Sequence, residues 1–338
     1  MPINEEWLEK VVEEAIEPEL PIIDPHHHLW NTGNTYVDKP YMAEELILDL
    51  DSGHNILATV FVECSAFYRD SGPKHLRPVG ETEFVNRVAD ESAGNISDTR
   101  QLCSGIVGHA DLTLGKEVDE VLEAHLEVAP DRMRGIRHSV PWDSSPDIRV
   151  NREPGLLANA KFREGARRLA AYNLSFEAWL YHPQIPELTA FAKACPDVTI
   201  VFDHFGGPLG IGPYIGKRSE IYQQWKDNVT ELSACPNVFA KLGGLNMAIN
   251  GFGWHKRIVP PSSNELAANN HYYLHTIDQF GPERCMFESN FPVDKVSCSY
   301  GVLWNSFKKM VSHLSRTQKA ALFPVSYTHL TLPTKRIV

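Results

Sequence analysis

The sequence is poor in the features that assign a chain to a class at once. Its 338 residues include only six cysteines, far apart and without a C-x-x-C pair, so we expect reduced thiols rather than a disulfide framework. Basic residues number 32 against 43 acidic ones, a formal net charge of −11, which disfavours binding to nucleic acid or anionic membranes. Neither a secretory signal nor a bilayer-spanning stretch is evident. We therefore expect a cytoplasmic protein whose partners are small molecules.

What the sequence does contain is a regular alternation of two patterns. Eight short, β-rich apolar runs cover residues 21–27, 56–64, 103–109, 134–140, 174–181, 198–204, 237–242 and 284–289. Polar or amphipathic stretches of helical character separate them, among them 81–92, 116–129, 159–172, 185–195, 221–234 and 264–280. Alternating strands and helices imply parallel strands with crossover helices, and eight repeats at this length predict the α/β class and a single-domain (β/α)8 TIM barrel.

An open, doubly wound sheet is the main rival to the barrel. No Gly-x-Gly-x-x-Gly follows the first run and no Walker-type loop occurs, which removes the usual phosphate-binding signatures of that rival. We predict an N-terminal extension over 1–20 and the barrel over 21–323. Residues 324–338 break the preceding helical pattern and resemble translated cloning or sequencing-adapter sequence, so we predict a non-native tail and a truncated closing helix.

The first run leads into a group of histidines. Pro21-Ile22-Ile23 is followed by Asp24-Pro25-His26-His27-His28-Leu29-Trp30. On an extended strand successive side chains alternate, so Asp24, His26 and His28 are expected on one face and His27 on the other. Neutral imidazole binds metals and transfers protons near pH 7. A histidine-rich surface loop is the alternative, but the apolar lead-in favours a buried strand.

Polar side chains also follow most of the other runs. Catalytic groups of a barrel project from the carboxyl ends of its strands, and histidines stand near the ends of several runs, at His109, His138, His182 and His204. A single such histidine is more often a structural residue. Their recurrence at equivalent places favours a common site.

Four motifs together resemble the amidohydrolase superfamily. They are Asp24 to Trp30, Arg134-Gly135-Ile136-Arg137-His138, Phe202-Asp203-His204-Phe205-Gly206-Gly207-Pro208 and Phe287-Glu288-Ser289-Asn290-Phe291-Pro292. Over residues 20–323 the chain is similar to the amidohydrolase-related (amidohydrolase 2) branch of TIM-barrel, metal-dependent hydrolases. The resemblance implies lactone hydrolysis, with decarboxylation as the known alternative in this branch.

The resemblance also implies roles for individual residues. It makes His26 and His28, with His204, the candidate ligands of a divalent metal such as zinc or manganese, although lactonase-like members can act without metal. His182 and His204 are implied as catalytic histidines. Arg137 suits a bidentate clamp on a substrate carboxylate, and a structural ion pair is its alternative.

The motif after the eighth run departs from the family pattern. Where the family usually has a catalytic aspartate this chain has Asn290, and an amide cannot act as a general base. Three interpretations follow: Asn290 orients water while Asp294 supplies the carboxylate, Glu288 reaches the site from deeper in the barrel, or hydrolytic activity has been lost. We favour the first, because a loop aspartate has freedom to reach its water.

Three further residues are candidate substrate-binding groups. Lys241 could neutralise a substrate carboxylate or an oxyanion, or pair with a neighbouring strand. Trp30 could line an apolar pocket, or pack in the core. His138 follows Arg137 directly and is included with it.

These inferences predict a hydrolase that opens a lactone or similar ester-like bond in a small, carboxylated metabolite. A metal-dependent decarboxylase on the same barrel is one alternative. A barrel that binds a metabolite without catalysis is another, with Asn290 as its main support. The sequence leaves a homo-oligomer open and does not identify the substrate.

Overall fold

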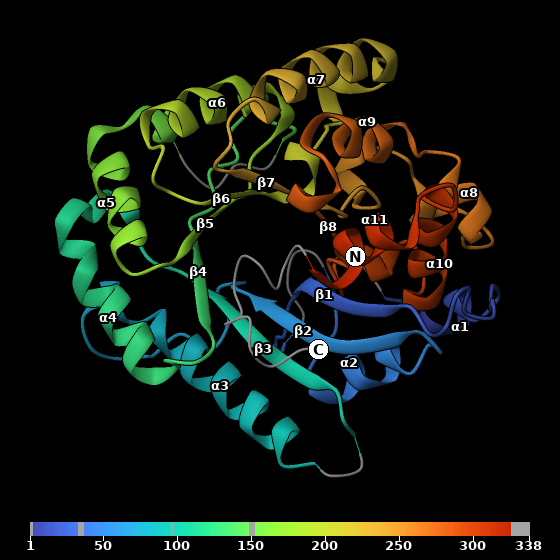
Figure 1. Ribbon diagram of the computed structural model, residues 1–338, viewed down its shortest axis with the longest axis horizontal. Coiled ribbons are helices and arrows are strands. Elements are labelled where there is room, and N and C mark those ends of the chain that lie inside the picture. The colour runs from blue at the N-terminus through green and yellow to red at the C-terminus, as the bar shows by residue number, and fades with distance from the viewer. Residues whose placement is uncertain (1–2, 33–36, 96–97, 149–152, 326–338) are drawn as a thin grey trace.

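Eight parallel strands form one sheet in the order β1 to β8 (Figure 1). The computed structural model describes residues 3–32, 37–95, 98–148 and 153–325. The strands are β1 Pro21–His27, β2 Asn55–Val62, β3 Gln101–Gly108, β4 Met133–Arg137, β5 Ser175–Ala178, β6 Ile200–Phe202, β7 Val238–Leu242 and β8 Cys285–Phe287. Each of the eight predicted runs overlaps one of them, although β2, β3 and β4 begin one or two residues earlier than predicted, which confirms the predicted TIM barrel.

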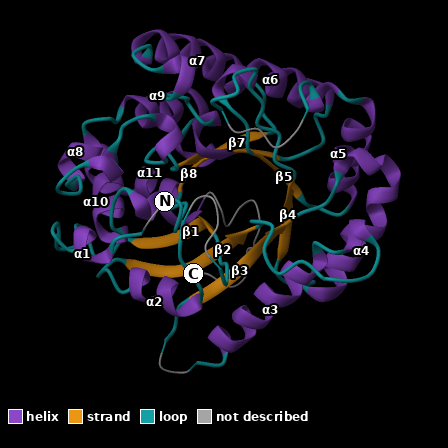
Figure 2. Ribbon diagram, turned by 180° about the vertical axis from the view of Figure 1, so that it is seen from behind, coloured by secondary structure: helices purple, strands orange, loops and turns teal. Residues whose placement is uncertain are grey.

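Helices surround the strands on the outside (Figures 1 and 2). The longer ones are α2 Ala43–Leu50, α3 Val79–Ala93, α4 Val118–Val128, α5 Ala160–Ala171, α6 Ile185–Ala194, α7 Arg218–Ser233, α9 His271–Phe280 and α10 Tyr300–Met310. Three short helices are α1 Glu5–Leu8, α8 Ser263–Ala267 and α11 Arg316–Ala320. The predicted stretch 264–280 is divided into α8 and α9 at Asn269 and Asn270, since asparagine is a weak helix former.

The barrel is closed by the segment that follows β8. Phe291 forms an isolated parallel bridge with His27, and the His28 N–H donates to the Phe291 carbonyl at 2.8 Å. The Asn290 N–H donates to the His26 carbonyl at 2.9 Å. Closure therefore fastens the chain after β8 directly to the histidine run of β1.

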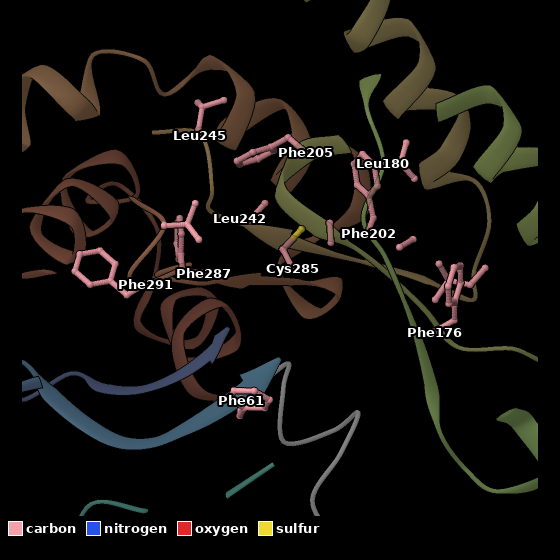
Figure 3. Close-up of a cluster of buried hydrophobic side chains, with 14 of the residues drawn as sticks. Phe61, Phe176, Leu180, Phe202, Phe205, Leu242, Leu245, Cys285, Phe287 and Phe291 are labelled. Carbon is pink, nitrogen blue, oxygen red and sulfur yellow. The ribbon is translucent and has the colours of Figure 1, made fainter. Parts of the chain in front are cut away.

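Two apolar layers enclose the barrel wall. Aromatic side chains such as Phe176, Phe202 and Phe287 fill the space between strands and helices (Figure 3). A smaller cluster inside the barrel contains Ile23, Val60, Val62, Val107 and Met286, with Phe239 packed against it. Because strand side chains two positions apart share a face, Lys241 lies on the same side as Phe239, and Glu288 continues the side of Met286. The apolar layer thus supports a polar layer above it.

A bulge in β1 corrects one expectation about its faces. Between Asp24 and His27 the strand advances three residues while its neighbour β2 advances two, from Thr59 to Phe61. The Asp24 carboxylate accepts from the Ser289 N–H at 2.9 Å and from the Tyr300 hydroxyl of α10 at 3.0 Å. The prediction that Asp24 shares a face with His26 was wrong, because a bulge re-aims the side chains that precede it.

The segment before β1 packs on the outer helices. The Ile16 N–H donates to the Asn305 side chain of α10 at 2.8 Å, and Lys308 donates to the carbonyls of Ile16 and Glu17 at 2.7 and 3.0 Å. The predicted tail lies outside the described residues from position 326 onward, so it stays a prediction together with the boundaries at 20 and 323.

Two further observations concern cysteines and membranes. All six cysteines are free thiols, as the cysteine spacing predicted. None of the helices in the described ranges combines the length and the apolar character that crossing a membrane requires.

Candidate active site

Six polar side chains meet at the carboxyl ends of the strands, and we call them the interior cluster. They are His26 and His28 of the β1 end, Arg137 of β4, His204 after β6, Lys241 of β7 and Glu288 after β8. Each is at most 7% exposed. This is the end of the barrel at which TIM-barrel active sites lie.

The two histidines of β1 face each other, as the alternation predicted. Their Nε2 atoms are 3.3 Å apart, while His27 lies on the other side against Phe61 and Cys103. His28 Nδ1 donates a hydrogen bond to the Val62 carbonyl at 2.7 Å, which leaves His28 Nε2 as an acceptor. Burial lowers the pKa of both rings well below the ordinary value, and nearby cations add to the effect.

Glu288 joins two histidines from different strands. Its Oε1 accepts from His204 Nδ1 at 2.6 Å, and its Oε2 lies 2.8 Å from His26 Nδ1. Glycines make this contact possible: a Cβ atom at Gly243 would collide with Glu288, and one at Gly244 with the ring of His204. Of the two carboxylates weighed from the sequence, Glu288 is the one that contacts the cluster histidines.

Arg137 of β4 is held by Glu63, the residue that follows β2, and one of its nitrogens is turned toward the histidines. Its Nε donates to Glu63 Oε1 at 2.9 Å, and Nη2 donates to the Glu63 carbonyl. Nη1 lies 3.3 Å from His26 Nε2. The ion pair considered from the sequence is present, and it points the guanidinium into the interior cluster.

Lys241 pairs with two carboxylates that the sequence reading did not select. Its Nζ donates to Glu177 Oε2 of β5 at 2.6 Å and lies 3.8 Å from Asp203 Oδ1. Burial opposes the ammonium charge, but these carboxylates and Glu288 raise the pKa of Lys241. Two features of the sequence could have indicated these residues. Glu177 is a charged residue within an apolar run, and Asp203 directly precedes His204.

Asn290 and Asp294 lie together beside the interior cluster. The backbone of Asn290 is left-handed, with φ 55°, a conformation that asparagine tolerates better than most residues. Its Nδ2 is 3.5 Å from Asp294 Oδ2. Burial, followed by the charge of Glu288, raises the pKa of Asp294 well above its ordinary value, which disfavours the carboxylate form that a general base requires.

The comparison with known proteins agrees with this geometry. A family model described as Amidohydrolase matches residues 23–324. The chain belongs to the amidohydrolase family. It is therefore a hydrolase of that family, as the motifs predicted.

Relatives of this amidohydrolase include proteins of known and unknown activity. It is 29% identical to the uncharacterised protein y4mH of Sinorhizobium fredii over 90% of this chain and 96% of the relative. It is also 29% identical to an L-fucono-1,5-lactonase of Burkholderia ambifaria, over 70% of this chain and 75% of that enzyme. An amidohydrolase structure from Burkholderia multivorans with bound zinc superposes with a TM-score of 0.72 at 22% identity, covering 92% and 99% of the two chains.

The donor set of this amidohydrolase suits a divalent metal. His26, His204 and Glu288, or His26, Glu177 and Asp203, offer ligand atoms within 4.8 Å of one another. The facing Nε2 atoms of His26 and His28 also fit, because two nitrogens bound to one tetrahedral zinc at about 2.0–2.1 Å lie about 3.3 Å apart. His26 belongs to every one of these sets.

Two predicted site histidines lie away from the interior cluster. Within the described residues, His182 accepts from the Leu209 N–H at 3.2 Å and packs edge-on against Tyr214; burial lowers its pKa to about 4. His138 accepts from the Leu112 N–H and packs on Phe162 of α5. Because Arg137 points inward, strand alternation turns the next residue toward the helices.

Two tryptophans pack against the histidines of the interior cluster, and one of them was selected from the sequence. Trp30 stacks on His28 with ring centroids 5.6 Å apart, so it borders the interior cluster, and its role as a pocket residue stays a prediction. Trp179, which the sequence reading did not select, packs edge-on against His204 at 5.1 Å. Both indole rings therefore lie against imidazoles of the interior cluster.

Proposed function

We propose that this amidohydrolase adds water to a lactone or similar ester-like bond in a small, carboxylated metabolite. The observation that carries the proposal is the Glu288–His204 pair, which lies in a buried cluster beside the cations Arg137 and Lys241. The similarity to an L-fucono-1,5-lactonase supports a lactone as the substrate class.

In the proposed mechanism His204 activates the water. A proton on Nδ1, donated to Glu288 at 2.6 Å, leaves a lone pair on Nε2, which can accept a proton from water. Glu288 then stabilises the imidazolium that forms, as carboxylates do in carboxylate–imidazole pairs. The water oxygen bonds to the lactone carbonyl carbon, the ring C–O bond breaks, and His204 returns the proton to the departing alkoxide.

The carbonyl oxygen gains negative charge in this reaction, and the cluster supplies cations to meet it. Arg137 Nη1 lies at His26, where it can donate to an oxyanion or to a substrate carboxylate, because preorganised donors stabilise developing charge. A divalent ion held by His26 and His28 would supply Lewis-acid polarisation of the same carbonyl.

The remaining predicted residues keep secondary roles in this proposal. Asn290, with Asp294, would orient the water or the substrate through its amide. Trp30 would form an apolar wall beside His28. His182 and His138 would act only through the loops that they fasten, as their contacts with Leu209 and Leu112 suggest.

A lactone panel with a carboxyl-to-amide variant tests the proposal. We expect the unmodified enzyme to hydrolyse at least one sugar-acid or pyrone lactone, and Glu288→Gln to lower kcat by about 10²- to 10⁴-fold, because the imidazole loses its anionic partner. Asp49→Asn, which alters a buried carboxylate outside the cluster, is the matched control and should keep the activity.

Product analysis separates the competing reactions. Hydrolysis in ¹⁸O-water places the label in the product carboxylate. Release of carbon dioxide without incorporation of label would identify a decarboxylase instead. A wild-type rate in Glu288→Gln would contradict the proposed role of the Glu288–His204 pair.

A further inference from the structure

The ammonium of Lys241 lies inside one of the two candidate metal-ligand sets. Its Nζ is 2.6 Å from Glu177 Oε2, 3.8 Å from Asp203 Oδ1 and 3.4 Å from His26 Nδ1. Those three residues are the ones whose ligand atoms lie within 4.8 Å of one another. The ammonium group of Lys241 thus lies among two carboxylates and one imidazole that could otherwise bind a metal ion.

The contacts of the ammonium within the described residues are with groups that could themselves bind a metal. Lys241 is 1% exposed, and its partners among the described residues are these ligand-type groups. Arg137 is already paired with Glu63, so Lys241 is the cation that neutralises Glu177 and Asp203. A metal ion placed in the same pocket would meet a like charge within a few ångströms.

The two ring nitrogens of His26 have different neighbours. Its Nε2 faces the Nε2 of His28, and its Nδ1 lies 2.8 Å from Glu288 Oε2 and 3.4 Å from Lys241 Nζ. Because the two nitrogens point to opposite sides of the ring, a metal held with His28 and the ammonium of Lys241 occupy separate places.

We propose that Lys241 is a built-in cation that keeps metal out of the ligand set formed by Glu177, Asp203 and His26, and that removal of its ammonium creates a second divalent-metal site. The inferred site takes a borderline metal such as zinc, which accepts mixed nitrogen and carboxylate ligands. The proposal concerns metal count alone and holds whether or not the enzyme opens lactones.

Zinc counting on the full chain tests the proposal. Wild-type protein and Lys241→Ala are stripped with chelator, equilibrated with zinc by dialysis, and compared by elemental analysis. We expect Lys241→Ala to bind one zinc ion more per chain than wild type. Its thermal unfolding should also respond to zinc more strongly, since free zinc at ~100 times Kd lowers the apparent unfolding constant about 100-fold.

Two controls locate the extra ion. Lys241→Ala/Glu177→Gln should return to the wild-type zinc count, because one anionic ligand is lost. Lys308→Ala removes another buried lysine that contacts a histidine, but its remaining partners are the carbonyls of Ile16 and Glu17, so no zinc should be gained.

Each contrary outcome overturns the proposal. A folded Lys241→Ala with the wild-type zinc count would do so, and so would an extra ion that persists in the double variant. If Lys241→Ala folds only with zinc, the proposal is supported. If Lys241→Ala does not fold at all, Lys241→Gln takes its place, because glutamine removes the charge and keeps a donor near Glu177. The proposal then requires Lys241→Gln to bind the extra ion.

Discussion

Two buried lysine–histidine contacts occur in different regions of this protein. In the barrel interior Lys241 Nζ lies 3.4 Å from His26 Nδ1. In the outer layer, between α10 and the segment before β1, Lys308 Nζ lies 2.8 Å from His54 Nδ1. Both lysines are 1% exposed, so residue type and burial are the same in the two places.

The two contacts differ in the charges around them. Lys241 faces Glu177, Asp203 and Glu288, which raise its pKa in spite of burial. Lys308 donates mainly to backbone carbonyls, and burial lowers its pKa to about 8. The pKa of the two lysines is therefore decided by the neighbouring carboxylates rather than by the lysine–histidine contact itself.

The largest difference that we expect between the two regions is in the effect of a histidine substitution on activity. His26→Ala should lower kcat by about 10²- to 10⁴-fold, because it removes a residue shared by the imidazole pair and the Glu288 bridge. His54→Ala should leave kcat unchanged at temperatures where the protein is folded, since the ring nitrogens of His54 contact Lys308 and the Gly301 carbonyl, which lie outside the interior cluster. Steady-state kinetics on a lactone substrate compares them, and equal losses in both variants would remove the distinction.

A smaller difference is expected in stability. In chelator at pH 7, Lys241→Met should lower the free energy of unfolding by about 3–5 kcal/mol, because it leaves two buried carboxylates without their cation. Lys308→Met should cost about 1–3 kcal/mol, because it leaves carbonyl acceptors without a donor. Urea unfolding followed by circular dichroism measures both, and a larger loss in Lys308→Met would reverse the comparison.

The smallest expected difference is in pH dependence. Lys308 has a folded pKa of about 8 and an unfolded pKa of about 10.4, so between these values the unfolded state binds more protons. Stability contributed through Lys308 therefore rises with pH over this window, by at most about 2 kcal/mol after solvent screening.

The difference in unfolding free energy between wild type and each methionine variant isolates this effect from other titrating groups. For Lys308→Met the difference should change in favour of wild type from pH 8 to 10. For Lys241→Met it should stay nearly flat, because Lys241 is mostly charged over that range in both states: its pKa is raised in the folded protein and is about 10.4 in the unfolded chain. A flat line for Lys308→Met would show that its ammonium is not destabilised by burial.

Local patterns predicted the elements well and the contacts between them less well. All eight strands were found, because apolar runs and helical stretches are encoded within short windows of sequence. The bulge at Asp24 was not predicted, because it arises from the pairing of β1 with Thr59 and Phe61 on β2. One extra residue there reversed the expected face of Asp24 without disturbing the pair His26 and His28.

Glu288 and Asp294 show the same limit within the candidate site. Both carboxylates follow β8, and loop freedom favoured Asp294 from sequence. In the structure Asp294 lies beside Asn290, whereas Glu288 reaches His26 and His204. Two glycines after β7 leave the space for that reach, a relation between distant segments that no local pattern contains.

The sequence by itself determined the number and order of the strands, their alternation with helices, the amidohydrolase motifs, and the pairing of His26 with His28 on one face. Only the tertiary structure decided that Glu288 links His26 to His204, that Lys241 fills a pocket of Glu177 and Asp203, and that His182 and His138 lie elsewhere. The physical reason is that the direction of a side chain along one strand follows from alternation. Contacts between side chains at the ends of different strands depend on how the barrel closes.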